Sequence, residues 1–239
     1  MKSLISAALL ALPLALGASA ASAQAYPSKS IRWLVPYPAG GGADFLARTI
    51  GQQLSTQIGQ PVVIENKPGG NTAIAASEVA RAPADGYTVL SADNGTMVFN
   101  TALYGKLSYN PDKDLTPVTL MGRFPMILVA GPASDAKDAK DFIAKAKAQP
   151  GKISYGSAGA GSPHHLAMEL LKNNAKLHMV HIPYRGAAPA LTDLLGGQVP
   201  LFLDPPPNLI QPAKAGRITL IGVASEKRLP MLPDVPTFI

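Results

Sequence analysis

Eight short runs rich in branched aliphatic residues recur along the chain, and most of them are followed by a turn and a helical pattern. They lie at residues 31–36, 61–66, 87–92, 126–131, 152–157, 178–183, 199–204 and 218–224. Strands that alternate with helices build mainly parallel sheets, which helices cover on both faces. The alternation therefore predicts an α/β fold, and it constrains the architecture more than any other feature of the sequence.

Three of the predicted helices carry boundary signals. The first repeats apolar residues every four positions from Leu46 and meets Gly59, which predicts its end. Ser162 followed by Pro163 has the residue types of an N-cap and a first helical turn. A third helix is expected over residues 187–195, before two glycines.

The first 25 residues have the layout of an export signal. Lys2 gives a positive start, the apolar stretch 4–16 is too short for a stable membrane anchor, and residues 23–25 are small enough for cleavage. No later stretch has the roughly 20 apolar residues of a spanning helix. We therefore expect a periplasmic protein whose mature chain starts at Tyr26; an uncleaved anchor is the alternative.

The amino-acid composition limits the kinds of site and ligand that the chain can have. None of the 239 residues is cysteine, which excludes disulfides, thiolate metal sites and a cysteine nucleophile. Without Lys2 the chain has 20 Lys and Arg against 15 Asp and Glu, an excess that favours anionic ligands but is too dilute for nucleic acid. The densest charged stretch, residues 134–152, predicts a solvated helix whose inward residues include Phe142 and Ala146.

Four of the strand-to-helix corners are rich in Gly or Pro and nearly free of charged side chains. They lie at residues 36–44, 66–71, 156–163 and 183–189. In open parallel sheets such corners lie at the carboxyl ends of the strands, where ligands bind. The following helix presents unpaired N–H groups and the positive end of its dipole, which bind anions without an arginine. The corners therefore predict an anion site, although any single one is also compatible with a tight turn alone.

Other ligand chemistries lack their motifs. No Lys closes either glycine cluster as in a Walker loop, and residues 156–161 have the order G-x-x-G-x-G, which is not the dinucleotide fingerprint. A hydrolase elbow requires Gly two residues before the serine, but Tyr155 stands there for Ser157 and Ala160 for Ser162. Nucleotide and serine-hydrolase functions are therefore disfavoured.

The four histidines raise the question of a metal site. His164 and His165 are adjacent in a first helical turn, and His178 and His181 follow at a spacing of three. Adjacent helical residues point about 100° apart, and the zinc-protease pattern H-E-x-x-H is absent. We therefore predict neither a metal nor a cofactor.

Seven segments carry a resemblance to a known family. They run in order from about Tyr26 to the last residues: VPYPAGGGADFLAR, VVIENKPGGN, ADGYTVLSADNGT, KDLTPVTL, PGKISYGSAGAGSPHHLAMELL, HIPYRGAAPALTDLLGGQV and RLPMLPDVPTF. Together they resemble the substrate-binding proteins of tripartite tricarboxylate transporters, the Bug family. The resemblance implies a type II-like periplasmic binding protein of two α/β domains and a two-stranded hinge, with the solute in the cleft between them as in a Venus flytrap.

The resemblance also implies which residues bind the ligand. In this family backbone amides, small hydroxyls and bound waters hold a carboxylate, mainly at the first corner of each domain. Carried over to this sequence, the binding residues are Tyr37, Pro38, Ala39, Gly40, Gly41, Gly42, Asp44, Asn94, Thr96, Ser157, Ala158, Gly159, Gly161, Ser162, His165, Tyr184, Gly186 and Asp204. Asp44 is further expected to cap the helix after the first corner.

The resemblance assigns residues 26–123 and 225–239 to domain 1 and residues 124–224 to domain 2. Family members usually continue further and return to the first domain, so we expect that the C-terminal part of domain 1 is missing from this chain. The segment LFLDPPPNLIQPAKAG departs from the family pattern by three prolines after Asp204, which leaves its ligand contacts open.

The leading hypothesis is a monomeric, non-enzymatic binding protein that captures a small carboxylate, such as a dicarboxylate or tricarboxylate, and delivers it to the membrane subunits of a transporter. One alternative is a sensory module that presents the liganded form to a signalling receptor. Another is an exported hydrolase that uses Ser157 or Ser162 with His165. The sequence does not identify the acid.

Overall fold

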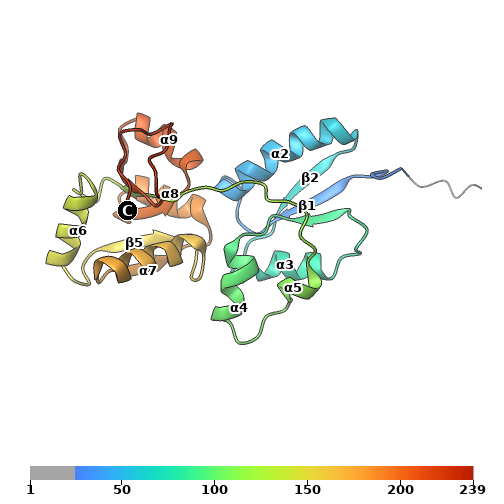
Figure 1. Cartoon of the computed structure of the whole chain (residues 1–239), viewed down its shortest axis with the longest axis horizontal. Helices are drawn as coiled ribbons and strands as arrows, with labels where there is room; N and C mark the ends of the chain where they lie inside the picture. Colours follow the sequence, from blue (N-terminus) through green and yellow to red (C-terminus); the bar gives the residue numbers. More distant parts are fainter. Residues whose placement is uncertain (1–24, 239) are drawn as a thin grey trace, which may run out of the picture.

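The computed structural model describes residues 25–238 and contains two sheets, each within its own lobe (Figure 1). We call residues 25–114 the first lobe and residues 127–238 the second lobe; residues 115–126 form the connecting segment. The predicted export signal lies, apart from its last residue, outside the described residues. Within them, no helix is both long enough and apolar enough to cross a membrane.

The first lobe contains a three-stranded parallel sheet of order β2-β1-β3. Its elements are β1 (Ile31–Val35), α2 (Gly42–Ile58), β2 (Val62–Asn66), α3 (Ala73–Ala80) and β3 (Thr88–Leu90), followed by the π-helix η1 (Gly95–Phe99), α4 (Asn100–Leu103) and α5 (Pro111–Asp114). The helices α2 and α3 cover opposite faces of this sheet (Figure 1). All three strands were predicted from their apolar runs.

The second lobe contains a five-stranded sheet of order β6-β5-β7-β4-β8. Its elements are β4 (Ile127–Ala130), α6 (Ala139–Ala148), β5 (Ser154–Ser157), α7 (Pro163–Ala175), β6 (Val180–Pro183), α8 (Ala187–Leu195), β7 (Leu201–Asp204), α9 (Pro206–Lys214) and β8 (Thr219–Val223). Strand β5 pairs in parallel with β6 and β7, whereas β4 pairs antiparallel with β7 and β8. The predicted α/β class with mainly parallel sheets is confirmed.

Both faces of the second sheet are buried, because alternate residues of its strands point to opposite sides. In β4, Ile127 and Val129 belong to the apolar cluster that includes α8 and α9, and Leu128 and Ala130 belong to the cluster that includes α6 and α7. In the same way, β7 contributes Phe202 to the first of these clusters. The sheet is therefore the middle layer of three.

The predicted helix boundaries are confirmed. Helix α2 ends at Gly59, whose φ of 65° is the left-handed conformation that glycine adopts without strain. Ser162 is the N-cap of α7 and Pro163 is its first residue. On the charged helix α6, Phe142 is buried and Asp138 accepts the N-terminal cap hydrogen bond.

The chain passes between the lobes once within the described residues, through the connecting segment (Figure 1). The backbone N–H of Ala224 donates to the carbonyl of Met126, so β8 ends beside the point where the segment enters the second lobe. Of the expected two-stranded hinge, residues 25–238 therefore contain one connection, since the residues after Ala224 pack on the second lobe.

The segment after β8 packs on the second lobe, whereas residues 225–239 were expected in domain 1. Leu229, Leu232 and Val235 contact the apolar cluster of α8 and α9, and Thr237 forms a bridge with Val223. The reason is local: the apolar residues recur every three positions after a turn and meet the edge strand β8 of the second sheet. Ile239 lies outside the described residues.

Candidate binding site

The two lobes touch at glycine corners. A β-carbon at Gly42, in the first corner, would lie 2.9 Å from Cγ of Pro205 in the second lobe. Gly186 has a φ of 125°, and a β-carbon there would lie 2.5 Å from Cδ of Pro38. Any side chain at either glycine would therefore collide with the opposite lobe.

A second pair of corners also meets at this boundary. A β-carbon at Gly161, whose φ is 77°, would lie 2.8 Å from Nδ2 of Asn71. One at Gly95 would lie 3.6 Å from Cδ of Pro163. All four predicted corners, at residues 36–44, 66–71, 156–163 and 183–189, therefore take part in the contact between the lobes.

Four helices begin at this boundary: α2, α7, α8 and α9. Their N-cap residues are Gly41, Ser162, Gly186 and Pro205. The first N–H groups of a helix have no acceptor within the helix, and its dipole places partial positive charge there. Prolines at the start of α9 carry no N–H, so the donors come mainly from the other three helices. Such a convergence suits a carboxylate.

Asp44 has a different role from the predicted cap. The helix begins two residues before it, with Gly41 as N-cap and no side-chain cap hydrogen bond. Asp44 instead accepts the N–H of Gly40 at 2.9 Å, the Nδ2 of Asn66 at 2.9 Å and the Nε of Arg48 at 3.0 Å. Asp44 therefore fixes the shape of the glycine loop and removes the Gly40 amide from the donors available to a ligand.

The charge of Asp44 is compensated within the first lobe. Its burial opposes ionisation, but the hydrogen bonds from Arg48, Gly40 and Asn66 outweigh this and hold the pKa of Asp44 below its usual value. The carboxylate is thus a paired anion, and its repulsion of a bound carboxylate is reduced.

A buried polar network lies beneath the corners of the first lobe. The side chain of Asn100, which is fully buried, donates to the carbonyl of Asn71 at 2.7 Å and lies 3.1 Å from the hydroxyl of Tyr109. The Nδ2 of Asn71 donates to Oδ1 of Asn100 at 2.5 Å. Asn71 and Thr72 have positive φ angles of 47° and 74°. The network holds this left-handed pair, which non-glycine residues rarely adopt.

The same network reaches the predicted ligand residues of the first lobe. The Thr96 hydroxyl lies 2.9 Å from that of Thr72 and 3.0 Å from Asp93, and the Tyr37 hydroxyl donates to Asp93 at 2.6 Å. Burial and the Asp93 carboxylate raise the pKa of Tyr37 well above its usual value. Thr96 is fully buried and supports the corner from behind, whereas Asn94 is exposed.

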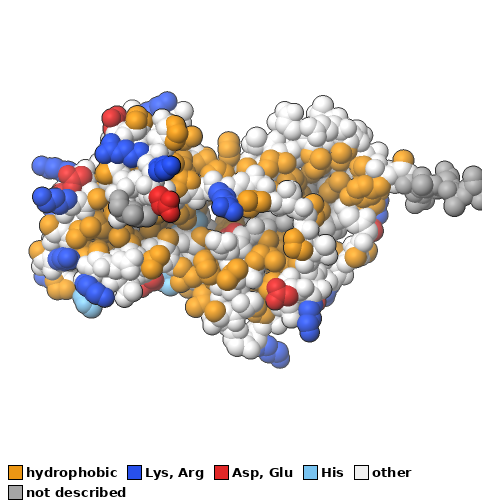
Figure 2. Space-filling model, in the orientation of Figure 1, with side chains coloured by type: hydrophobic (Ala, Val, Ile, Leu, Met, Phe, Trp, Pro, Cys, Tyr) orange, Lys and Arg blue, Asp and Glu red, His pale blue; other side chains and the backbone are white. Residues whose placement is uncertain are grey.

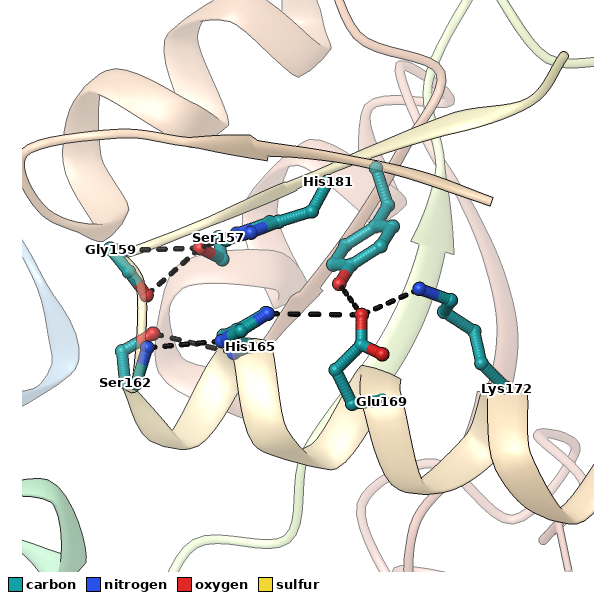
Figure 3. A network of polar contacts seen from close by, with 9 residues as sticks. Ser157, Gly159, Ser162, His165, Glu169, Lys172 and His181 are labelled. Carbon is teal, nitrogen blue, oxygen red and sulfur yellow. Dashed lines mark hydrogen bonds and ion pairs between the residues drawn. The ribbon is translucent and has the colours of Figure 1, made fainter. Parts of the chain in front are cut away.

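The second-lobe corner is held by its own polar network (Figure 3). The Ser157 hydroxyl lies 2.6 Å from Nε2 of His181 and accepts the N–H of Gly159 at 3.1 Å. Ser162 accepts the N–H of His165, and Nδ1 of His165 accepts the N–H of Gly161 at 3.0 Å. The predicted hydroxyls and His165 thus position the backbone of the corner.

Two stacked imidazoles form the centre of this network. The rings of His165 and His181 lie 3.9 Å apart and nearly parallel. Burial lowers the pKa of His165, and burial together with the neighbouring His165 lowers the pKa of His181 to about 4. Glu169 lies 3.7 Å from His165 and is paired with Lys172 at 2.6 Å. Both histidines are therefore neutral at pH 7.

This geometry does not support the hydrolase alternative. Ser157 and Ser162 are both fully buried, so neither hydroxyl is open to a substrate. Ser157 contacts His181 instead of the expected His165, whose Nδ1 is occupied by the Gly161 amide. Among residues 25–238, no group of three His, Asp or Glu side chains is placed to hold a metal ion.

Two predicted residues are engaged in side-chain hydrogen bonds within the second lobe. The hydroxyl of Tyr184 donates to Asp193 at 2.8 Å, and burial together with this carboxylate raises the pKa of Tyr184 to about 12. Asp204 is fully buried and accepts from Nδ2 of Asn208 at 2.8 Å, with Nε2 of His164 at 3.1 Å.

Sequence reasoning missed several residues of this boundary, among them Asn71, His164 and Asn208. Asn71 lies in a predicted corner but was not selected, because its left-handed conformation has no sequence signal. His164 was considered together with His165, as a metal ligand or as a hydrogen-bond donor near the corner, and was not selected. Its partner Asp204 is 40 positions away, so their contact depends on the sheet order.

The first lobe has two hollows, and the second of them borders the corner at residues 66–71. One, of about 620 Å³, includes Tyr104 and Asp112 in its lining, and the other, of about 490 Å³, includes Asn71 and Lys106. Both are lined by the first lobe alone. The four helix N-termini, to which both lobes contribute, are therefore the candidate site.

Comparison with known proteins decides the family. The model described as "Tripartite tricarboxylate transporter family receptor" (TctC) matches residues 46–239. The chain belongs to this family. A solved structure described as a periplasmic transporter is 42% identical with a TM-score of 0.84, covering 90% of this chain and 72% of its own.

Two further TctC-like structures from Rhodopseudomonas palustris contain ligands. Rpa4515 with adipate is 37% identical with a TM-score of 0.87, covering 89% of this chain and 71% of its own. MatC (Rpa3494) with bound malate is 34% identical with a TM-score of 0.83, covering 89% of this chain and 72% of its own. The resemblance to the Bug family and the periplasmic-binding-protein fold are therefore confirmed, and the family is one of transport receptors, not of enzymes.

Proposed function

We propose that this TctC family member binds a small organic acid between its two lobes, in the periplasm, and delivers it to the membrane subunits of a tripartite tricarboxylate-type transporter. The observation that carries the proposal is the convergence of the N-termini of α2, α7, α8 and α9 at one boundary. Backbone N–H groups and helix dipoles from both lobes favour an anion there. Adipate and malate, bound by two relatives, are small dicarboxylates of the expected class.

The lobes act as the two domains of a clamp, with residues 115–126 as the flexible connection. A ligand that contacts both lobes stabilises the closed form by the interactions that the open form lacks. The glycines at the boundary are required for this closure because a side chain at Gly42 or Gly186 would meet the opposite lobe. The signal-like first 25 residues support export to the compartment of the relatives.

Calorimetry with a panel of monocarboxylates, dicarboxylates and tricarboxylates tests the proposal. In wild type at least one acid should bind, and Gly42→Ala should weaken it. Alanine suits the helical backbone at this position, but its β-carbon would lie 2.9 Å from Pro205. Overpacking of this kind typically costs about 1–3 kcal/mol, or roughly tenfold to a hundredfold in affinity.

Gly105→Ala is the matched control, because a β-carbon at Gly105 meets no atom within 4 Å. Its affinity should equal that of wild type. Binding of no carboxylate, or equal affinity in Gly42→Ala and Gly105→Ala, would contradict a carboxylate site at this boundary. Co-purification with the transporter's membrane subunits, or with a receptor in their place, separates transport from sensing.

A further inference from the structure

A buried carboxylate at the lobe boundary holds one histidine in a fixed orientation. Asp204 at the end of β7 is fully buried, with Nε2 of His164 at 3.1 Å and Nδ2 of Asn208 at 2.8 Å. The imidazole also stacks on Phe202, with ring centroids 5.6 Å apart and planes 7° apart. His164 therefore has little freedom to turn.

The second ring nitrogen of His164 has no partner. Among the buried side-chain nitrogen and oxygen atoms of residues 25–238, Nδ1 of His164 alone lacks a hydrogen bond. Buried polar atoms of native proteins are nearly always paired, so an unpaired one indicates a ligand or a trapped water. Because Nε2 is engaged with Asp204, the ring cannot turn to satisfy Nδ1 without losing that contact.

The neighbours of His164 and Asp204 are among the groups that join the lobes. His164 follows Pro163, which is next to Gly95 of the first lobe. Asp204 precedes Pro205, the residue closest to a β-carbon at Gly42, and Nδ2 of Asn208 lies 4.0 Å from the same position. The His164, Asp204 and Asn208 cluster therefore borders the proposed carboxylate site.

The chemistry of Nδ1 indicates what it would recognise. With a proton on Nε2 directed at Asp204, Nδ1 accepts a hydrogen bond when the ring is neutral and donates one when it is charged. A hydroxyl group satisfies either form because it both donates and accepts, whereas a methylene group satisfies neither. A site that leaves a polar atom unpaired discriminates against a ligand that lacks the matching group.

We infer that His164, held by Asp204, is a specificity-determining residue that selects carboxylates bearing a hydroxyl group over the same acids without one. The inference rests on the proposed function, because it assumes that the carboxylate is bound at the lobe boundary. His164 contacts the hydroxyl through Nδ1, and the converging helix N-termini hold the carboxylate.

Malate and succinate form a matched pair of probes, since they differ by one hydroxyl group. Calorimetry on wild type should show malate bound about tenfold more tightly, which is the usual effect of one hydrogen bond to an otherwise unpaired buried group. In His164→Phe, which keeps a ring against Phe202, the two affinities should become equal. His178→Phe, at an exposed histidine, is the control and should keep the wild-type ratio.

A second measurement uses the wild-type protein, because His164→Phe leaves Asp204 without its histidine partner and can fail to fold. In ¹⁵N NMR of labelled histidines, saturating malate should shift the Nδ1 resonance of His164, and saturating succinate should leave it in place. Only four histidines are present, which makes their assignment practical.

Two outcomes overturn the inference, and only the second of them also contradicts the proposed function. If both acids bind and their affinity ratio is the same in wild type and His164→Phe, or the Nδ1 resonance responds equally to both, a trapped water satisfies Nδ1 and the inference fails alone. If no carboxylate in the wider panel binds, the proposed function fails with it.

Discussion

The two lobes are stabilised in different ways. The second lobe has two apolar clusters of twelve buried residues each, one on either face of its sheet. The apolar cluster of the first lobe has only Trp33, Val35 and Ala47 as buried members. In Figure 2 hydrophobic side chains are spread over the visible face of the first lobe, whereas many of the Lys and Arg residues lie over the second. The first lobe must rely more on polar contacts.

Those contacts are the network around Asn100 and the bonds of Arg32 to Glu65 and Glu78. Polar networks fix a geometry precisely when every member is paired, and they lose much of their value when one member is removed. Apolar clusters respond instead to lost volume. The comparison therefore predicts which kind of substitution damages which lobe, and Trp33, the single tryptophan, reports on the first lobe by fluorescence.

The largest effect is expected from Phe142→Ala in the second lobe. Phe142 is 1% exposed and lies on α6, away from the lobe boundary. Truncating a buried phenylalanine typically costs about 3–5 kcal/mol of unfolding free energy. Hydrogen exchange should show faster opening of second-lobe peptides, with the Trp33 transition nearly unchanged. If Phe142→Ala destabilised both lobes together, the lobes would unfold as one unit, and the proposed difference between them would be wrong.

Asn100→Ala should be the most damaging polar substitution in the first lobe. It removes the partner of Asn71 and one contact of Tyr109. Leaving a buried polar group unpaired costs about 1–3 kcal/mol, and more than one group is affected here. Urea unfolding followed by Trp33 fluorescence measures the loss. Thr101→Ala, at the exposed neighbour, is the control, and equal stabilities of the two variants would contradict a network role.

The sequence predicted the strands and the helix ends better than the polar network of the first lobe, for the same physical reason. All eight strands followed from their apolar runs, and Gly59, Ser162 and Pro163 marked helix ends because each has a local conformational preference. The polar network has no such signal. Thr72 and Asn100 are 28 residues apart, and their contact arises only when β2, α3 and η1 are in place.

The same distinction between local and long-range contacts applies to the candidate site. The glycine corners were predicted because glycine has a conformational reason to be there, as the φ of 86° at Gly40 shows. The roles of Asp44 and His164 were not predicted from the sequence. Asp44 acts through Gly40 and Asn66 across a loop, and His164 acts through Asp204.

Low pH should lower the stability of the second lobe more than that of the first, by less than the substitutions above do. All four histidines lie in the second lobe. The pKa of His181 is lowered to about 4 and that of His165 is also lowered, so the unfolded chain, with a His pKa of about 6.5, binds protons that the folded lobe does not. The second lobe should therefore lose stability as the pH falls from about 6.5 towards 4.

The first lobe should keep its stability over that range. Its shifted carboxyls, including Asp44, Glu65 and Glu78, have lowered pKa values, so their contribution is lost only as the pH falls from the usual carboxyl range towards those lowered values. Hydrogen exchange of each lobe at a series of pH values measures the difference. His181→Gln should flatten the response of the second lobe, and an unchanged slope in this variant would exclude His181 as its source.

The smallest effect is expected from the ion pairs, and here the first lobe should be the more sensitive. Arg32 on β1 donates to Glu65 on β2 at 2.8 Å and to Glu78 on α3 at 2.9 Å, so it joins three elements. Lys145 pairs with Asp141 within α6 and with Asp135 just before it. Exposed pairs contribute little individually, but Arg32→Gln also leaves two carboxylates facing each other.

Arg32→Gln should therefore lower the melting temperature of the first lobe by less than Asn100→Ala does, and Lys145→Gln should change that of the second lobe hardly at all. Salt distinguishes the cause: at 1 M NaCl, where the Debye length is about 3 Å, the difference between Arg32→Gln and wild type should shrink. A difference that persists in salt would mean that Arg32 acts through the packing of its aliphatic stem, and the first lobe would then depend less on charge than the comparison of the lobes implies.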